Sequence, residues 1–224
     1  MKSVLIIGAS RGLGLEFVRQ YRHDGWLTLG TCRSPEQDAL LTAVGATALR
    51  LDVADENGFA NLGKALAGRS IDVCIYNAGI SGPRSPNVVA PEADEFDAVM
   101  HANVLGALRA IPVVAPALAR ASGTFAFISS RMGSIGLMAG SGSVTYRASK
   151  AALNAVVKAA ALEWGPKGVT CVTFHPGWVK TDMGGANAPL AVEDSVRALI
   201  EFIDRLAPEH YGGFFSSDGR RLPW

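Results

Sequence analysis

The chain has 224 residues, of which 49% are hydrophobic and 18% charged, and its 21 basic and 20 acidic side chains nearly cancel. This length suits one domain and is too short for a coenzyme domain followed by a separate substrate domain of usual size. The net charge of +1 gives no basic field for nucleic acid, and the many apolar residues exclude intrinsic disorder.

Composition also predicts a cytoplasmic, reduced and metal-free protein without a membrane segment. The longest apolar stretch, residues 110–119, is shorter than the roughly 20 residues that a membrane span needs. Only four strongly apolar residues precede Gly8, fewer than a secretory signal of about 7–15 requires. The three cysteines show no CxxC spacing, and the four histidines show no metal-binding pairing.

Short apolar runs alternate with longer helical patterns along the whole chain. The alternation predicts an α/β fold with a doubly wound parallel sheet, in which ligands bind beyond the carboxyl ends of the strands. Ser34 and Asp55 are expected to cap the helices that follow them. The expected strands are residues 3–7, 27–31, 46–51, 71–76, 124–129, 170–174 and 213–216. The expected helices are residues 12–24, 36–44, 55–67, 91–121 (divided near His101), 146–164 and 192–206.

A glycine-rich turn joins the first expected strand to the first expected helix. Glycine lets the backbone approach a pyrophosphate closely, and a helix N-terminus supplies free N–H donors and a positive dipole end. The turn therefore predicts a dinucleotide site, although a glycine-rich turn can also serve only as a tight turn. The residues expected to bind there are Gly8, Ser10, Arg11, Gly12, Leu13 and Gly14.

Two arginines indicate which dinucleotide is bound. Arg11 lies at the helix N-terminus, where a nearby anion would offset its charge, and Arg33 follows the second strand. No acidic residue stands at that strand end to bind a ribose 2′-hydroxyl, whereas two guanidinium groups suit a 2′-phosphate. We therefore predict NADP(H) as the coenzyme; the alternative is two solvated surface arginines.

Two further strand ends are expected to border the coenzyme. Asp52, followed by Val53, ends the third strand and is placed to accept a hydrogen bond from adenine, or else to cap the next helix. Asn77, Ala78 and Gly79 end the fourth strand, where small residues let the coenzyme cross the sheet edge. Asn77 could equally be a turn residue that satisfies local backbone groups.

Tyr146 and Lys150 open a strongly helical segment. Their spacing of four places the phenol and the ammonium on one helix face. A free phenol has a pKa near 10, and a neighbouring cation would lower that pKa and give the tyrosine an acid–base role.

The motifs together resemble the short-chain dehydrogenases/reductases, and within them the branch of C-factor and Sniffer-type carbonyl reductases. The resemblance covers essentially the whole chain and implies a single Rossmann-type domain. The residues that carry it are GASRGLG (8–14), Asn77-Ala78-Gly79, Asn103, Ile128-Ser129-Ser130, Tyr146 with Lys150, and PGWVKTDM (176–183).

The resemblance implies a role for each matching residue. Tyr146 would exchange a proton with the substrate oxygen, Lys150 would lower the tyrosine pKa and hold the nicotinamide ribose, and Ser130 would stabilise the developing alkoxide. Asn103 would hold a water that connects Lys150 to solvent. Pro176, Gly177, Val179 and Thr181 would border the nicotinamide. Ser129 as a strand-end hydrogen bonder, and ordinary turn and helix roles for the whole polar set, are the alternatives.

The segment after Thr181 is short for a substrate lid, so we expect an open site of modest specificity for a small carbonyl or alcohol compound. Met132, Met138, Trp178 and Met183 are candidate wall residues, with ordinary core packing as the alternative. The resemblance implies a homodimer or homotetramer through helices 103–121 and 146–164. A coenzyme-binding signalling protein with little turnover is the second functional reading, and an extended nucleotide-sugar epimerase is disfavoured because no sugar domain fits.

Overall fold

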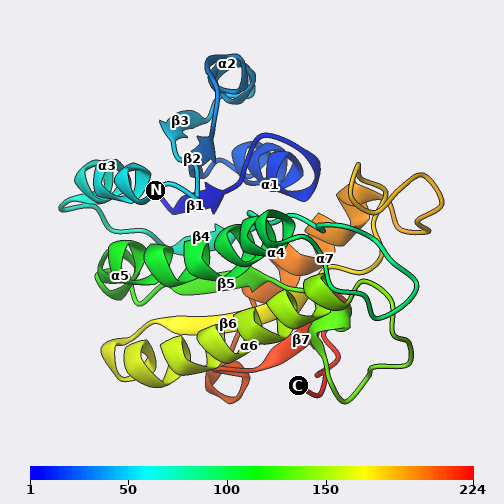
Figure 1. The fold of residues 1–224 in the computed structure, drawn as a ribbon. Coiled ribbons are helices and arrows are strands. Elements are labelled where there is room, and N and C mark those ends of the chain that lie inside the picture. The colour runs from blue at the N-terminus through cyan, green and yellow to red at the C-terminus, as the bar shows by residue number, and fades with distance from the viewer.

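Seven short apolar runs form the strands of one parallel sheet in the computed structural model, which describes residues 1–224 (Figure 1). Their order across the sheet is β3-β2-β1-β4-β5-β6-β7. The predicted doubly wound sheet of seven strands is confirmed, and the strand ends differ from the predicted ones by at most two residues. The strands are β1 (Ser3–Ile7), β2 (Leu27–Cys32), β3 (Thr47–Arg50), β4 (Val73–Tyr76), β5 (Thr124–Ile128), β6 (Thr170–His175) and β7 (Phe214–Ser216).

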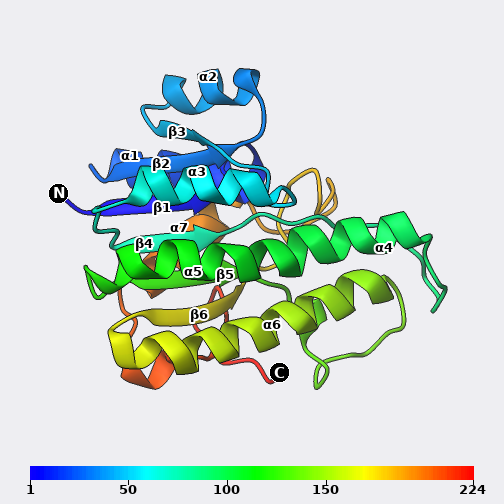
Figure 2. The same cartoon turned by 60° about the vertical axis from the view of Figure 1, so that its left-hand side comes forward.

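Helices cover both faces of this sheet and divide the core in two (Figures 1 and 2). Successive side chains of a strand point to opposite faces, so in β5 Phe125 and Phe127 join one core while Ala126 and Ile128 join the other. The first core packs under α3, α5 and α6, and the second under α1, α2 and α7. The helices are α1 (Gly12–His23), α2 (Pro35–Ala43), α3 (Glu56–Leu66), α4 (Ala93–Met100), α5 (Gly106–Ala119), α6 (Val144–Trp164) and α7 (Val192–Ile203).

The two predicted helix caps have different outcomes. The Asp55 carboxylate accepts a hydrogen bond from the Asn57 N–H at 3.0 Å and caps α3. Ser34 occupies the N-cap position of α2, as predicted, but its side chain makes no capping hydrogen bond. Pro35 stands at the start of α2 instead, where its fixed φ suits the helix and its missing N–H costs nothing.

The predicted helix over 91–121 forms as one continuous run from Ala93 to Ala119. The α-helical geometry is interrupted near His101, where a division was predicted: His101–Leu105 form a single π-helical turn between α4 and α5, and the run continues through Pro112 and Pro116. By length and composition alone this helix could cross a membrane, but 56% of its apolar window is buried inside the fold. Its apolar character is therefore that of a core helix, which packs with α3 and α6.

Candidate active site

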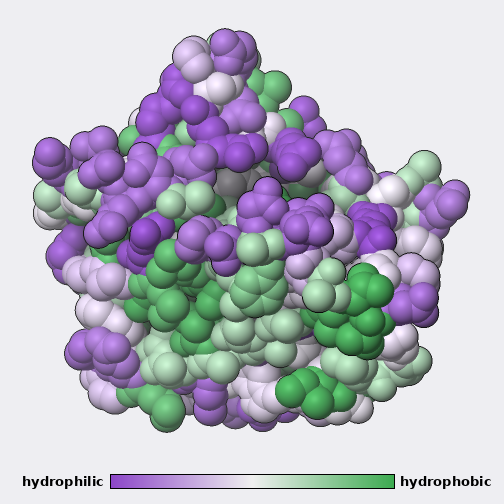
Figure 3. All heavy atoms as spheres, in the orientation of Figure 1, coloured by the Kyte–Doolittle hydropathy of each residue, from purple (hydrophilic) through white to green (hydrophobic).

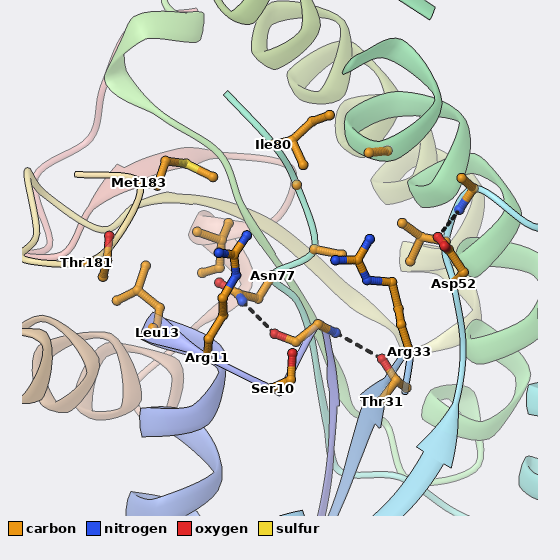
Figure 4. Close-up of a pocket in the computed structure, with 18 of the residues that line it drawn as sticks. Ser10, Arg11, Leu13, Thr31, Arg33, Asp52, Asn77, Ile80, Thr181 and Met183 are labelled. Atoms are coloured by element: carbon orange, nitrogen blue, oxygen red, sulfur yellow. Dashed lines mark hydrogen bonds between the residues drawn. The ribbon is translucent and has the colours of Figure 1, made fainter. Parts of the chain in front are cut away.

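The carboxyl ends of β1, β2 and β4 and the loops after β3 and β6 border a cavity of about 400 Å³ (Figure 4). Tyr146 and Lys150 border the same cavity, so the expected coenzyme and catalytic residues meet there. The predicted coenzyme residues on its border are Gly8, Ser10, Arg11, Gly12, Leu13, Arg33, Asp52, Val53, Asn77, Ala78, Gly79, Tyr146, Lys150, Pro176 and Thr181.

Two hydrogen bonds fix the glycine-rich loop at Gly8 (Figure 4). The Gly8 N–H donates to Thr31 Oγ1 at 2.9 Å, and Asn77 Nδ2 donates to the Gly8 carbonyl at 2.8 Å. Gly8 has a φ of +85°, and a Cβ there would lie 2.8 Å from Ala78 Cα, so only glycine fits. Asn77, which follows β4, therefore holds the loop that follows β1. Neither of its two sequence interpretations, a coenzyme-border residue or a local turn residue, predicted this contact.

Gly14 does not border the cavity, in contrast to its predicted place among the coenzyme residues. A Cβ at Gly14 would lie 2.0 Å from the Gly8 carbonyl oxygen and 2.7 Å from Asn77 Nδ2. The missing side chain thus lets α1 approach the loop closely, which places the helix N-terminus beside the cavity.

The N-terminus of α1 fits a phosphate group. Arg11 occupies the cap position, no side chain makes a capping hydrogen bond, and no acidic residue stands in the first turn. The N–H donors and the positive end of the dipole are therefore available to an anion. Arg11 and Arg33 both extend over the cavity from the two sides of Ser10 (Figure 4). These residues fit a phosphorylated dinucleotide.

Asp52 does not cap α3, and its predicted hydrogen bond with adenine stays a prediction. Its carboxylate borders the cavity and accepts a hydrogen bond from the Ala54 N–H at 3.0 Å. Because Asp55 caps α3, the alternative interpretation of Asp52 as the helix cap was wrong.

Lys150 is buried at the inner end of the cavity. Its ammonium donates to the Ile128 carbonyl at 2.9 Å and lies 5.7 Å from the centroid of the Tyr146 ring. Burial disfavours the charged form and lowers the pKa of Lys150 to about 8. The ammonium therefore remains protonated at neutral pH but loses its proton in mildly alkaline solution.

The pKa of Tyr146 shifts in the direction opposite to the expected one. Burial raises this pKa above its usual value of 10, while the hydrogen bond with Ser130 and the charge of Arg84 act against the increase. Desolvation outweighs these two contributions, so the phenol keeps its proton at neutral pH. The structure thus favours Tyr146 as a proton donor.

The two candidate serines have different surroundings. Ser129 is 2% exposed, and its hydroxyl donates to Asn154 Oδ1 at 2.7 Å, which ties the end of β5 to α6. Both serines border a second cavity together with Tyr146, but the Ser130 hydroxyl only accepts a hydrogen bond, from the Met132 N–H at 3.1 Å, and keeps its own proton available to donate. The geometry favours Ser130 as the substrate-facing serine and gives Ser129 the structural role.

Asn103 lies in the π-helical turn and is fully buried. Its side chain accepts from the Ile80 N–H at 2.8 Å and donates to the Ile80 carbonyl at 2.9 Å and to Ser149 Oγ at 2.9 Å. It borders neither cavity. The side chain therefore fixes the loop after β4 beside Lys150, while a part in proton relay stays a prediction.

The second cavity, of about 740 Å³, adjoins the first at Tyr146. Gly177 and Val179 border this second cavity and not the first cavity, the predicted coenzyme cavity, in contrast to the prediction. Of the four expected wall residues, Met132, Trp178 and Met183 line it, whereas Met138 does not and is 47% exposed.

Four charged or titratable side chains of this second cavity escaped the sequence analysis. They are Arg84, Arg131, Arg147 and His175. Arg131 and Arg147 directly follow Ser130 and Tyr146, so adjacency to the motifs was a usable signal. Nothing in the sequence indicated that Arg84 reaches this cavity, where it donates a hydrogen bond to the Met183 carbonyl.

The segment after Thr181 is compact and contributes little wall. The Lys180 N–H donates to the Leu190 carbonyl at 2.9 Å, and Thr181 Oγ1 accepts from the Gly184 N–H at 3.0 Å. Only Thr181, Met183 and Gly184 of this segment border the second cavity. The small contribution supports the expectation of an open substrate site.

The cysteines form no disulfide, and the histidines take part in no metal-binding cluster. Cys32, Cys74 and Cys171 are buried free thiols, as the sequence predicted. No group of three or more His, Cys, Asp or Glu side chains is arranged to hold a metal ion.

Comparisons with known proteins agree with this arrangement. The sequence model of the family described as short chain dehydrogenase matches residues 2–189. The C-signal protein of Myxococcus xanthus is 42% identical over 155 residues, which are 69% of this chain and 93% of that protein. The carbonyl reductase Sniffer of D. melanogaster superposes with a TM-score of 0.94 at 30% identity, over 100% of both chains. A carbonyl reductase from Pseudomonas aeruginosa PAO1 in complex with NADP has a TM-score of 0.86 at 31% identity, also over 100% of both chains.

Proposed function

Because the chain belongs to the short-chain dehydrogenase family, we propose that it is an NADP(H)-dependent reductase of small carbonyl compounds, which also oxidises the corresponding alcohols. The observation that carries this proposal is the position of Tyr146, which borders both the coenzyme-sized cavity and the second cavity. Proton exchange between this phenol and a substrate in the second cavity requires that shared border.

The preference for NADP(H) rests on Arg11, Arg33 and the uncapped N-terminus of α1. The helix N-terminus would hold the pyrophosphate, and the two guanidinium groups would bind the 2′-phosphate. Asp52 and Val53 would border the adenine, and Lys150 and Thr181 the nicotinamide end. When bound, the coenzyme supplies or accepts the hydride. The NADP complex of a reductase 31% identical to this chain supports the same choice.

Residues of this chain would donate the proton to the substrate oxygen and stabilise the negative charges that develop in the reaction. In carbonyl reduction Tyr146 donates its phenolic proton to the substrate oxygen, and Ser130 donates a hydrogen bond to the same oxygen as negative charge develops on it. The buried Lys150 ammonium, held by the Ile128 carbonyl, stabilises the tyrosinate that remains. Asn103 keeps the loop after β4 in place beside this lysine.

The experiment is a screen of ketones, aldehydes and quinones for oxidation of NADPH, run with the wild-type chain, Tyr146→Phe and Tyr211→Phe. Tyr211 is 42% exposed and borders neither cavity, so its variant is the matched control. We expect turnover by the wild type and Tyr211→Phe, and at least a 100-fold loss of kcat in Tyr146→Phe with NADPH binding retained. Full activity of Tyr146→Phe would reject the proposed mechanism.

A second candidate function is intercellular signalling by a coenzyme-binding protein, favoured by the 42% identity with C-signal. The same screen separates the two functions. A chain that binds NADPH but reduces none of the carbonyl compounds would support the signalling function and remove the reductase.

A further inference from the structure

Three arginines converge on the second cavity from three separate segments. Arg84 comes from the loop after β4, Arg131 from the 3-10 turn after β5, and Arg147 from the first turn of α6. None of them borders the coenzyme cavity, which has its own pair, Arg11 and Arg33. The two cavities therefore have separate sets of cationic side chains.

No acidic side chain lines the second cavity to balance these charges. None of the six ion pairs of the chain includes Arg84, Arg131 or Arg147. Asp182 and Asp218 form ion pairs with other arginines, Asp182 with Arg11 at 3.3 Å and Asp218 with Arg220 at 3.1 Å.

The three guanidinium groups retain donors for a ligand. Arg131 makes no hydrogen bond through its side chain, Arg147 uses only Nε, toward the Gly142 carbonyl at 2.8 Å, and Arg84 uses only one terminal nitrogen, toward Met183. His175 lies beside them, and its Nδ1 atom is buried without a hydrogen-bond partner. Burial and the charge of Arg131 lower the pKa of His175 to about 4, so it adds a neutral hydrogen-bonding group.

A cavity with three uncompensated cations next to the reacting tyrosine is poorly suited to a wholly apolar substrate. Guanidinium groups bind carboxylates and phosphates through paired, charge-assisted hydrogen bonds. We propose that the substrate is a carbonyl compound that carries an anionic group, a carboxylate or a phosphate, which Arg131, Arg84 and Arg147 bind while the carbonyl faces Tyr146. This inference rests on the proposed reductase function and names the substrate class of that site.

The test compares each anionic substrate with its uncharged counterpart. Keto acids with two to six methylene groups between the carbonyl and the carboxylate, and benzaldehydes with a 3- or 4-carboxylate, are assayed beside their methyl esters. The same aldehydes with a phosphate in place of the carboxylate form a second arm, which distinguishes the two anions. Each kcat/KM with NADPH is measured for the wild type, Arg131→Gln, Arg84→Gln and Arg197→Gln. Arg197 is exposed on α7 and lines neither cavity, so its variant loses the same charge elsewhere.

We expect the best anionic substrate to exceed its ester at least tenfold in kcat/KM, and added salt to reduce this ratio. Arg131→Gln and Arg84→Gln should each lower the ratio severalfold, whereas Arg197→Gln should preserve it. The inference would be overturned if the esters were reduced as efficiently as the anionic substrates across the panel. It would also be overturned if the ratio of the two kcat/KM values stayed the same in both Arg131→Gln and Arg84→Gln. Either result would leave the reductase function intact. If no compound of the panel, charged or uncharged, supported oxidation of NADPH, both the reductase function and this inference would be rejected.

Discussion

The Arg11 guanidinium lies 3.3 Å from the Asp182 carboxylate, so the glycine-rich loop is joined to the segment after β6 across the coenzyme cavity. Both side chains are mostly exposed, at 64% and 81%. A coenzyme phosphate that binds Arg11 would compete with this carboxylate, and an exposed ion pair contributes only modestly to stability.

The substitution Asp182→Asn should therefore tighten NADPH binding about two- to fivefold, and the gain should shrink at high salt. Dissociation constants from fluorescence titration measure the effect. Glu163→Gln is the control, because it removes one negative charge from an exposed pair, with Lys167 at 3.4 Å, outside both cavities. Weaker NADPH binding by Asp182→Asn would show that the carboxylate does not compete for Arg11.

Arg33 should determine the preference between the two nicotinamide coenzymes. We expect Arg33→Gln to lower kcat/KM with NADPH at least tenfold and to change the value with NADH little, because only NADPH has the 2′-phosphate. Steady-state kinetics with both coenzymes give the ratio. Comparable efficiency of the wild type with NADPH and NADH would contradict the proposed preference.

The two shifted pKa values predict different pH profiles for the two reaction directions. The pKa of Tyr146 is raised, so its proton-donating form persists through neutral pH, and the pKa of Lys150 is lowered to about 8. Carbonyl reduction should be nearly constant from pH 6 to 7.5 and should decline above pH 8 as Lys150 loses its charge. Alcohol oxidation needs the tyrosinate and should increase with pH until Lys150 limits it. A reduction rate that increases through pH 9 would contradict this assignment.

The close approach at Gly14 should make Gly14→Ala destabilising. The added Cβ would meet the Gly8 carbonyl oxygen at 2.0 Å, so α1 or the loop must move, at a cost of about 1–3 kcal/mol in the free energy of unfolding. Urea denaturation measures that free energy. Gly165→Ala is the matched control, because nothing lies within 4 Å of its added Cβ and its φ of −55° suits alanine. Equal stability of the two variants would mean that α1 does not depend on this contact.

The homodimer implied by the family resemblance stays a proposal, and an apolar face supports it. Apolar side chains gather over α5 and α6 on the face drawn in Figure 3. Leu108 on α5 is 47% exposed, and Leu162 on α6 is 70% exposed. Leu108→Lys should shift the chain toward monomer in analytical ultracentrifugation. Leu40→Lys is the control, because Leu40 lies on α2 and is also exposed. A wild-type monomer at micromolar concentration would exclude a stable dimer.

The sequence predicted the sheet and most of the coenzyme border because both depend on local patterns. Apolar runs specify strands, and the residues after each parallel strand reach one edge of the sheet whatever the details of packing. Thr31 and Asn77 were harder, since their hydrogen bonds to Gly8 join residues far apart in the chain. The direction of the Tyr146 pKa shift depends on burial, which spacing within one helix cannot give. The reach of Arg84 into the second cavity depends on how a long loop folds.

The π-helical turn at His101–Leu105 lengthens one turn of the helix from Ala93 to Ala119 by a single residue. Each residue of an α-helix turns the chain by about 100°, so this insertion sets the angular offset between α4 and α5. Asn103 lies in this π-helical turn and holds Ile80, the fourth residue of the loop that runs from β4 to Arg84. The π-helical turn is thus linked, through Asn103, to the same loop that carries Arg84 to the second cavity.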